Sequence, residues 1–257
     1  NSGGGTIDTN GNDSTFSGIL ANGDSSGALT KIGAGTLTLS SANTYTGGSN
    51  INAGILSIAS DANLGAAAGP VSFNGGTLRT TAAVALSRDI TLNIGGGTWD
   101  TQRQNSTLTG VISGSGALAQ LGTGTVILTG LNSYSGGTRL NTGTLNINNS
   151  SALGSGTVTV DAASTLQTAG SVLLPNNFLL NAGAISIDTQ GINSTLTGVI
   201  SGAGSLTKIG AGTLSLTGAN LYLGGTQLSA GTLSINSNQS LGTGTLTINA
   251  ATLKTEG

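Results

Sequence analysis

A three-fold internal repeat constrains the fold of this chain more than any other feature of its sequence. The segments at residues 1–8, 93–100 and 181–188 correspond to one another, so the period is 88 to 92 residues. Arrays of this kind bury a core by stacking each unit on its neighbours. The repeat predicts a single solenoid over residues 1–257, built of copies 1–92, 93–180 and 181–257, the last of which is shorter.

Words of alternating apolar and polar residues recur inside each copy at a spacing of roughly 19–22 residues. In one such word Leu37 and Leu39 alternate with Thr36 and Thr38, and this period of two is typical of a strand. No window carries the i, i+3, i+4, i+7 apolar stripe of a helix. We therefore expect an all-β chain in which helix is nearly absent.

Three all-β architectures repeat short strands, and the sequence favours one of them. A propeller needs blades of about 40–50 residues with an aromatic residue in each, whereas this chain has one Trp and three Phe. A sandwich depends on tight hairpins and does not repeat its strand words. A solenoid stacks the same words on one another at the roughly 4.8 Å spacing of neighbouring strands. The predicted fold is a parallel β-helix of about 12 rungs.

The composition removes most enzyme mechanisms. The chain has no His and no Cys, which excludes a Ser-His-Asp triad, a thiol nucleophile, a disulfide and the usual zinc sites. Only 6% of the residues are charged and the net charge is −2, so there is no basic field to attract nucleic acid. No stretch approaches the roughly 18 apolar residues of a transmembrane helix, and we expect no membrane insertion by this segment.

Carboxylates are the remaining candidates for catalysis, but their spacing is unsuitable. Asp8, Asp100 and Asp188 occupy equivalent positions one copy apart. A glycosidase needs two carboxyl groups within about 5–10 Å, whereas one copy of a solenoid is roughly 20 Å long at the usual strand spacing. We predict that the chain is not an enzyme and has no catalytic residue, no cofactor and no metal ligand.

Three tyrosines, Tyr45, Tyr134 and Tyr222, also recur once per copy. A row of aromatic rings is one way to stack on the faces of sugars. Tyrosines in turns also act as structural anchors, because most of the ring is easily buried. The sequence leaves ligand stacking and turn anchoring open, and favours turn anchoring.

The segments Gly33–Gly48, Gly122–Gly137 and Gly210–Gly225 each join a Gly-x-Gly-Thr strand to an Asn-x-Tyr-x-Gly-Gly turn. They resemble the passenger-associated strand repeat of autotransporter-type bacterial surface proteins. The third segment departs from the pattern, because Leu221 and Leu223 replace the small polar residues beside the tyrosine. The resemblance implies a right-handed β-helical passenger or stalk that is exported through the outer membrane of a Gram-negative bacterium and displayed outside it.

These observations predict a non-enzymatic extracellular structural module, a segment of a surface fibre, stalk or adhesin passenger that supplies length and stiffness. A carbohydrate-binding adhesin surface, using the Tyr positions or an Asn/Thr face, is the alternative, and a polysaccharide-cleaving β-helix enzyme is a third. The expected location is the cell surface, outside the outer membrane. Expected partners are further repeats or copies stacked end to end, because an exposed terminal rung is an unpaired strand template, and a glycan or host cell surface.

Overall fold

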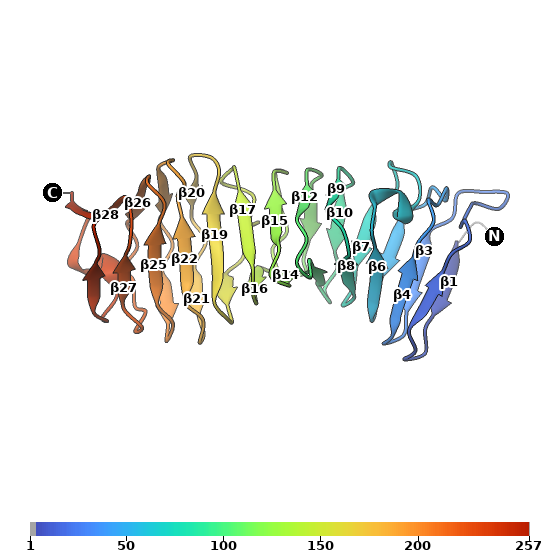
Figure 1. Cartoon of the computed structure of the whole chain (residues 1–257), viewed down its shortest axis with the longest axis horizontal. Helices are drawn as coiled ribbons and strands as arrows, with labels where there is room; N and C mark the ends of the chain where they lie inside the picture. Colours follow the sequence, from blue (N-terminus) through green and yellow to red (C-terminus); the bar gives the residue numbers. More distant parts are fainter. Residues whose placement is uncertain (1–3, 257) are drawn as a thin grey trace. The chain divides into compact units, whose positions relative to one another are not determined.

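The computed structural model describes residues 4–256 of the chain. Within this range the regular elements are short β-strands and two 3₁₀ helices, η1 (Asp61–Leu64) and η2 (Asn238–Leu241). The chain divides into two compact units, Asn1–Gly136 and Gly137–Gly257. In both units neighbouring strands run parallel (Figure 1). A single pattern of chain path therefore describes each unit.

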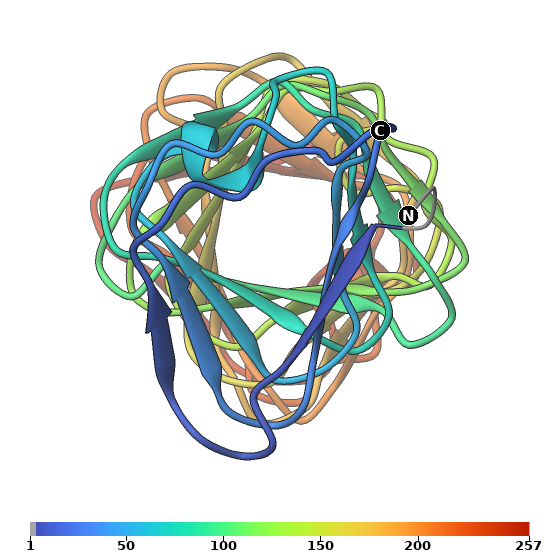
Figure 2. The ribbon, with the colours of Figure 1, turned by 90° about the vertical axis from the view of Figure 1, so that its right-hand side faces the viewer.

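Three sheets form the sides of the first unit. Sheet I contains β1 (Gly5–Asp8), β3 (Leu29–Ile32), β5 (Ser49–Ile51), β7 (Val71–Phe73), β10 (Ile90–Leu92) and β13 (Ile112–Gly114). Sheet II contains β2 (Ser14–Phe16), β4 (Thr36–Leu39), β6 (Ile55–Ile58), β8 (Thr77–Thr80), β11 (Gly97–Asp100) and β14 (Leu118–Leu121). Sheet III contains β9 (Val84–Leu86), β12 (Ser106–Leu108) and β15 (Thr125–Leu128). The chain visits the sheets in this order, and one pass is one turn around a common interior (blue to green in Figure 2).

The second unit is built in the same way. Sheet IV contains β16 (Thr138–Leu140), β18 (Val158–Val160), β21 (Phe178–Leu180) and β24 (Ile200–Gly202). Sheet V contains β17 (Thr144–Ile147), β19 (Ser164–Thr168), β22 (Ile185–Asp188), β25 (Leu206–Ile209), β27 (Thr226–Leu228) and β29 (Leu246–Ile248). Sheet VI contains β20 (Leu173–Leu174), β23 (Ser194–Leu196), β26 (Thr213–Leu216), β28 (Thr232–Ile235) and β30 (Thr252–Thr255).

Strict alternation of apolar and polar residues explains why these segments are strands. In β10, Ile90 and Leu92 are buried while Thr91 between them is exposed. In β21, Phe178 and Leu180 are buried in the same way. Each such apolar side chain contributes roughly 1.5–3 kcal/mol when it leaves water. The core is therefore a set of inward Leu, Ile, Val and Phe residues repeated in every turn.

The register between turns is one residue on one residue, so side chains line up in columns. Neighbours in a column lie about one strand spacing apart, roughly 4.8 Å. An inward column on sheet V consists of Leu145, Leu166 and Ile187. The outward column beside it consists of Thr144, Thr165, Ser186, Thr207, Gln227 and Thr247.

Successive copies do not place the same words on the same side. In the first unit β10 lies four turns beyond β1 on sheet I, and β11, which repeats the word of β1, follows on sheet II. In the second unit β16 lies on sheet IV, whereas β27, which repeats its word, lies on sheet V. One copy of the repeat thus makes four full turns and then runs along one further side of the solenoid. The same residues move to the next side of the solenoid with each copy.

The predicted fold class is confirmed, since the described chain is all-β, parallel and makes a solenoid of about 12 turns with almost no helix. The expectation that identical words stack on one another is wrong at the level of whole copies. The physical reason for this difference is that the length of a copy is not a whole number of turns. The strand stacked on a given word is a different word from the neighbouring turn of the array.

Removing an inward side chain should cost far more stability than removing its outward neighbour. We expect Leu166→Ala to lower the free energy of unfolding by about 2–5 kcal/mol, because it leaves a cavity between two turns that cannot close. The control Thr165→Ala, on the adjacent outward position, should change it by less than about 0.5 kcal/mol. Urea unfolding measures both, and equal effects would contradict the inward placement of Leu166.

Candidate functional site

The three tyrosines lie inside the solenoid. Tyr45 is 4% exposed, and Tyr134 and Tyr222 are 0% exposed. The hydroxyl of Tyr45 makes a 2.6 Å hydrogen bond with Ser49 Oγ, and that of Tyr222 makes a 2.5 Å bond with Thr226 Oγ1. Burial raises the pKa of Tyr45 and Tyr222 above its usual value. A ring without an open face cannot stack on a sugar, so the placement favours turn anchoring over ligand stacking.

A glycine of the following turn covers two of these rings. Gly65, at φ +78°, lies against Tyr45, and a Cβ atom there would sit 2.8 Å from ring atoms Cδ2 and Cε2. Gly242, at φ +67°, lies against Tyr222 in the same way, with a Cβ 3.1 Å from Cδ1. Any side chain at these glycines would lift the turn off the ring.

The tyrosines of the first unit do not form a row. Tyr45 follows β4 of sheet II and precedes β5 of sheet I, so it lies on the third side of its turn. Ser133 and Ser135, on either side of Tyr134, donate their backbone N–H groups to β13 of sheet I. The two rings occupy different sides because each copy ends one side further round than it began.

A buried asparagine two positions before each tyrosine bonds to a neighbouring turn. Asn43, Asn132 and Asn220 are at most 6% exposed. The Nδ2 atoms of Asn43 and Asn220 donate to carbonyls of the following turn at 2.6 and 2.7 Å. Each Oδ1 accepts a 2.8 Å hydrogen bond from a backbone N–H of the preceding turn, at Leu20, Ile112 and Ile200 respectively. The sequence marks these asparagines as part of the Asn-x-Tyr turn, but it does not show that they are buried or which turns they bond to.

Two lysines are buried with their ammonium groups in a cage of backbone carbonyls. Lys31 and Lys208 are both 0% exposed. Lys208 Nζ donates to the carbonyls of Ile209 (2.7 Å), Gly210 (2.7 Å) and Ala230 (3.2 Å). Lys31 donates to the three equivalent carbonyls at 2.8, 2.8 and 3.2 Å. The ammonium group of Lys208 gives the carbonyls of Gly210 and Ala230 a donor, while the carbonyl of Ile209 also accepts the backbone N–H of Thr189 at 3.2 Å.

Burial dominates the titration of both lysines. It lowers the pKa of Lys31, and it lowers the pKa of Lys208 to about 8, while the negative charges of Asp8 and Asp188 oppose the respective shifts. The second copy has Gln120 at the same position. The array therefore uses a charged and a neutral donor interchangeably at one corner, and this makes Gln a tolerated replacement.

The repeated aspartates form turns. Asp8 lies on sheet I, whereas Asp100 lies on sheet II, so the two do not face one another. In each copy the aspartate Oδ1 accepts a hydrogen bond from the backbone N–H of the residue two positions later. The pairs are Asp8 with Asn10 (2.8 Å), Asp100 with Gln102 (3.0 Å) and Asp188 with Gln190 (2.9 Å). The accepting carboxylate stabilises a left-handed residue that is not glycine, at φ 45–55°.

Further acidic residues are held by cationic or amide partners. Arg79 Nε donates to Asp100 at 2.8 Å. A hydrogen bond from Asn181, and a second from Arg139, hold the pKa of Asp161 below its usual value. Among residues 4–256 no three acidic, His or Cys side chains gather closely enough to hold a metal ion. The polar chemistry of this part of the chain serves turns and columns.

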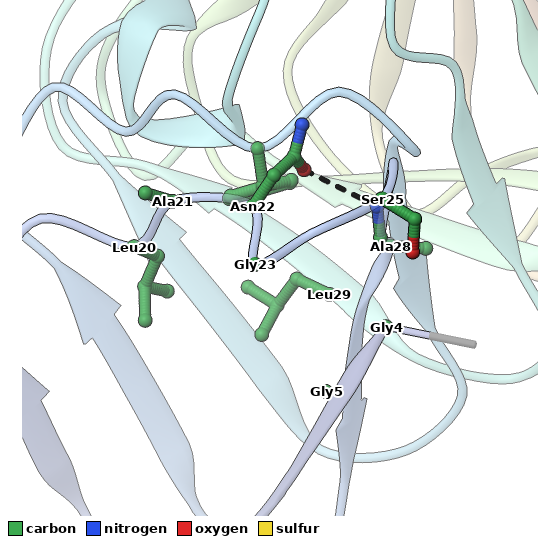
Figure 3. A pocket seen from close by; sticks show the side chains of 11 residues that line it. Gly4, Gly5, Leu20, Ala21, Asn22, Gly23, Ser25, Ala28 and Leu29 are labelled. Atoms are coloured by element: carbon green, nitrogen blue, oxygen red, sulfur yellow. Dashed lines mark hydrogen bonds between the residues drawn. The ribbon is translucent and has the colours of Figure 1, made fainter. Parts of the chain in front are cut away.

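The loop Leu20–Gly27 interrupts the first copy and opens a cavity of about 190 Å³ (Figure 3). The buried side chains of Leu29 and Tyr45 line its floor. Asn22 Oδ1 accepts the backbone N–H of Gly27 at 3.2 Å, which is the dashed line in Figure 3, and also that of Thr46. The cavity is smaller than the roughly 300–1,000 Å³ of small-molecule sites, and the amide of Asn22 is already occupied by the loop itself.

A second hollow, of about 220 Å³, lies on the outward face of sheet V. Gly225, at φ +84°, leaves a gap there, since a Cβ atom would meet the carbonyl of Thr245 at 2.7 Å. No charged and no large apolar residue lines the hollow. Its lining consists of Ser205, Thr207, Gly224, Gly225, Thr226, Gln227, Thr245 and Thr247.

The three copies share a buried Asn-x-Tyr corner, and each corner lies within a match to a known repeat family. The family model described as the passenger-associated-transport-repeat matches residues 29–58, 118–147 and 206–235. Each match runs from the strand that contains Lys31, Gln120 or Lys208 to the second strand after the corner. The chain carries three copies of this repeat, so the expected resemblance is confirmed.

One curated relative shares part of this sequence. The protein named Adhesin BmaC autotransporter, of Brucella suis biovar 1 (strain 1330), is 51% identical over 87 residues. That stretch is 34% of this chain and 2% of the relative. No solved structure matches the chain at a significant level. In the described part of the chain, no helix has the length and apolar character needed to cross a bilayer.

The caged lysine should make stability depend on pH. Because the folded state holds the pKa of Lys208 at about 8 against an ordinary 10.5, the unfolded chain binds more protons between these values, and stability rises with pH across this window. Between pH 7.5 and pH 10, we expect the free energy of unfolding of the native chain to rise relative to that of Lys208→Gln. Urea unfolding at the two pH values measures the difference.

The exposed Lys254 supplies the control, because its side chain is 61% exposed. Lys254→Gln should leave the pH dependence of the native chain unchanged over the same range. If Lys208→Gln and the native chain keep a constant difference in stability from pH 7.5 to pH 10, Lys208 is not buried as a charged group.

Proposed function

We propose that this chain is a cell-surface segment of an autotransporter-type adhesin passenger, and that its own role is structural and non-enzymatic. The observation that carries the proposal is the coincidence of the three family matches with the three buried corners. The relative named as an adhesin supports an extracellular, adhesin-type context. The segment acts as a stiff spacer that holds other parts of a longer protein away from the cell.

The packing supports a spacer. Within each unit, successive turns are joined by parallel backbone hydrogen bonds, and the buried Asn43 and Asn220 each bond to the turns on both sides. In such arrays each turn contacts only its neighbours, so length grows with the number of turns. Lengthening the array by whole copies adds reach without new contacts.

The side-chain chemistry supports a non-enzymatic role. The chain has neither His nor Cys. The repeated Asp100 and Asp188 accept backbone bonds in turns, and Asp161 is held by Arg139 and Asn181. Paired carboxyl groups at the distance of a glycosidase site need two such groups free to face a substrate, and these aspartates are committed to the fold.

Deleting one whole copy tests the spacer role. We expect the full-length parent protein without residues 93–180 to be exported, to resist protease on the cell surface and to be shorter in electron micrographs. The junction recreates the one between the first two copies, because copies start and end at equivalent positions. Attachment of the cells to their target should persist. Surface labelling with an antibody against the segment measures display.

A matched control removes part of a turn. Deletion of residues 118–128 takes out β14 and β15 and leaves an incomplete turn, so the neighbouring strands lose their partners. This variant should become sensitive to protease. Loss of attachment, or of a polysaccharide-cleaving activity, when residues 93–180 alone are deleted would show that the segment does more than space.

A further inference from the structure

We propose that the outward groove of sheet V binds an uncharged polysaccharide chain that lies along the solenoid axis. The inference builds on the proposed surface role, since a displayed passenger meets glycans there. The groove is formed by the side chains of Ser205, Thr207, Gln227, Thr245 and Thr247, on or beside the strands β25, β27 and β29.

The groups that face the groove are available to a ligand. None of these five side chains makes a hydrogen bond within the described chain, and each is partly or fully exposed. A hydroxyl group can donate and accept, and so can the amide of Gln227. The hydroxyls of a sugar have the same double character. The groove therefore offers sugar hydroxyls matching partners in either direction.

The groove selects against charged chains. The strands of sheet V carry two ionisable side chains, Asp188 and Lys208. Lys208 points inward and is 0% exposed, while Asp188 lies two turns from Gln227 along the sheet. No cation faces outward on these strands to neutralise a carboxylate or sulfate. An uncharged chain loses less hydration on this face than an anionic one.

The residues that line the groove come from three successive turns. Thr207, Gln227 and Thr247 are successive members of one outward column, about 4.8 Å apart in neighbouring turns. The column continues below them through Ser186 and Thr165. Gly225 keeps the parallel track between Ser205 and Thr245 clear of a side chain. An extended chain can thus contact several turns, and weak contacts add up along it.

The first copy shows that this groove is not a property of every repeat. The residues equivalent to Ser205 and Thr245 are Ala28 and Pro70, which have no hydroxyl. Asn50, the counterpart of Gln227, donates its Nδ2 to Thr30 Oγ1 at 3.3 Å and is partly satisfied within the protein. The site belongs to the third copy, and the first copy supplies its natural control.

Binding of neutral oligosaccharides tests the proposal. We expect cellohexaose, laminarihexaose or mannohexaose to shift the backbone amide NMR signals of Thr207, Gln227 and Thr247 in the 257-residue chain. The triple variant Thr207→Ala, Gln227→Ala, Thr247→Ala should weaken the binding at least tenfold. Its thermal unfolding should remain near that of the native chain, because all three side chains point outward.

Two controls make the result specific. The triple variant Thr30→Ala, Asn50→Ala, Ser72→Ala, on the equivalent face of the first copy, should bind as the native chain does. Gln227→Arg, which introduces the residue that the second copy has at this position, should weaken binding by filling the groove with a charged side chain. Both variants change only side chains at outward positions of strands, so folding is retained.

Three outcomes overturn the assignment. They are the absence of any shift with all three neutral oligosaccharides, unchanged binding by the triple variant on β25, β27 and β29, and equal binding of a hyaluronan hexasaccharide at the same residues. None of these results would affect the spacer role, which depends on display and length. Failure of surface display would in turn leave binding by the purified chain unchanged.

Discussion

The parallel backbone hydrogen bonds between successive turns are the constraint on which the rest of the structure depends. They hold neighbouring turns about 4.8 Å apart and place each side chain on its counterpart. Like charges at that distance repel, which accounts for a chain with only 6% charged residues. Arg79 and Asp100 are neighbours in one column and form an ion pair at 2.8 Å, while Arg139 reaches Asp161, two positions beyond its own counterpart in the next turn, also at 2.8 Å.

The same ladder leaves backbone groups without strand partners wherever the chain turns a corner, and buried polar side chains supply what is missing. Asn220 accepts from the turn before and donates to the turn after. Lys208 donates to three carbonyls of its own corner and the next. An unsatisfied buried carbonyl is costly. The hydrogen bonds to these carbonyls therefore help to stabilise a charged lysine in the interior. The corners thus carry most of the specific polar chemistry of the interior.

The surface follows a different rule. Equivalent strands stack on one another in the same register in the first and third copies, as in Leu29 on Ser49 and Leu206 on Thr226, but the outward residues of these strands differ. The third family match covers residues 206–235, yet the groove on sheet V also needs Thr245 and Thr247 from the turn beyond it. In the first copy the corresponding turn brings Pro70 and Ser72. Outward chemistry therefore depends on which residues occupy the outward positions of neighbouring turns, and these differ between copies.

The sequence by itself determined the all-β class, the solenoid and the number of turns, because alternation such as that of Leu37 and Leu39 is local and survives any arrangement of the turns. It also determined that Tyr134 recurs in a turn, but not that its ring is buried. Only the tertiary structure decided that Lys208 is caged, that copies shift by one side, and that Thr207 and Thr247 share a groove. Each of these depends on how many residues complete a turn, because that number decides which side chains meet across neighbouring turns, and no local pattern contains it.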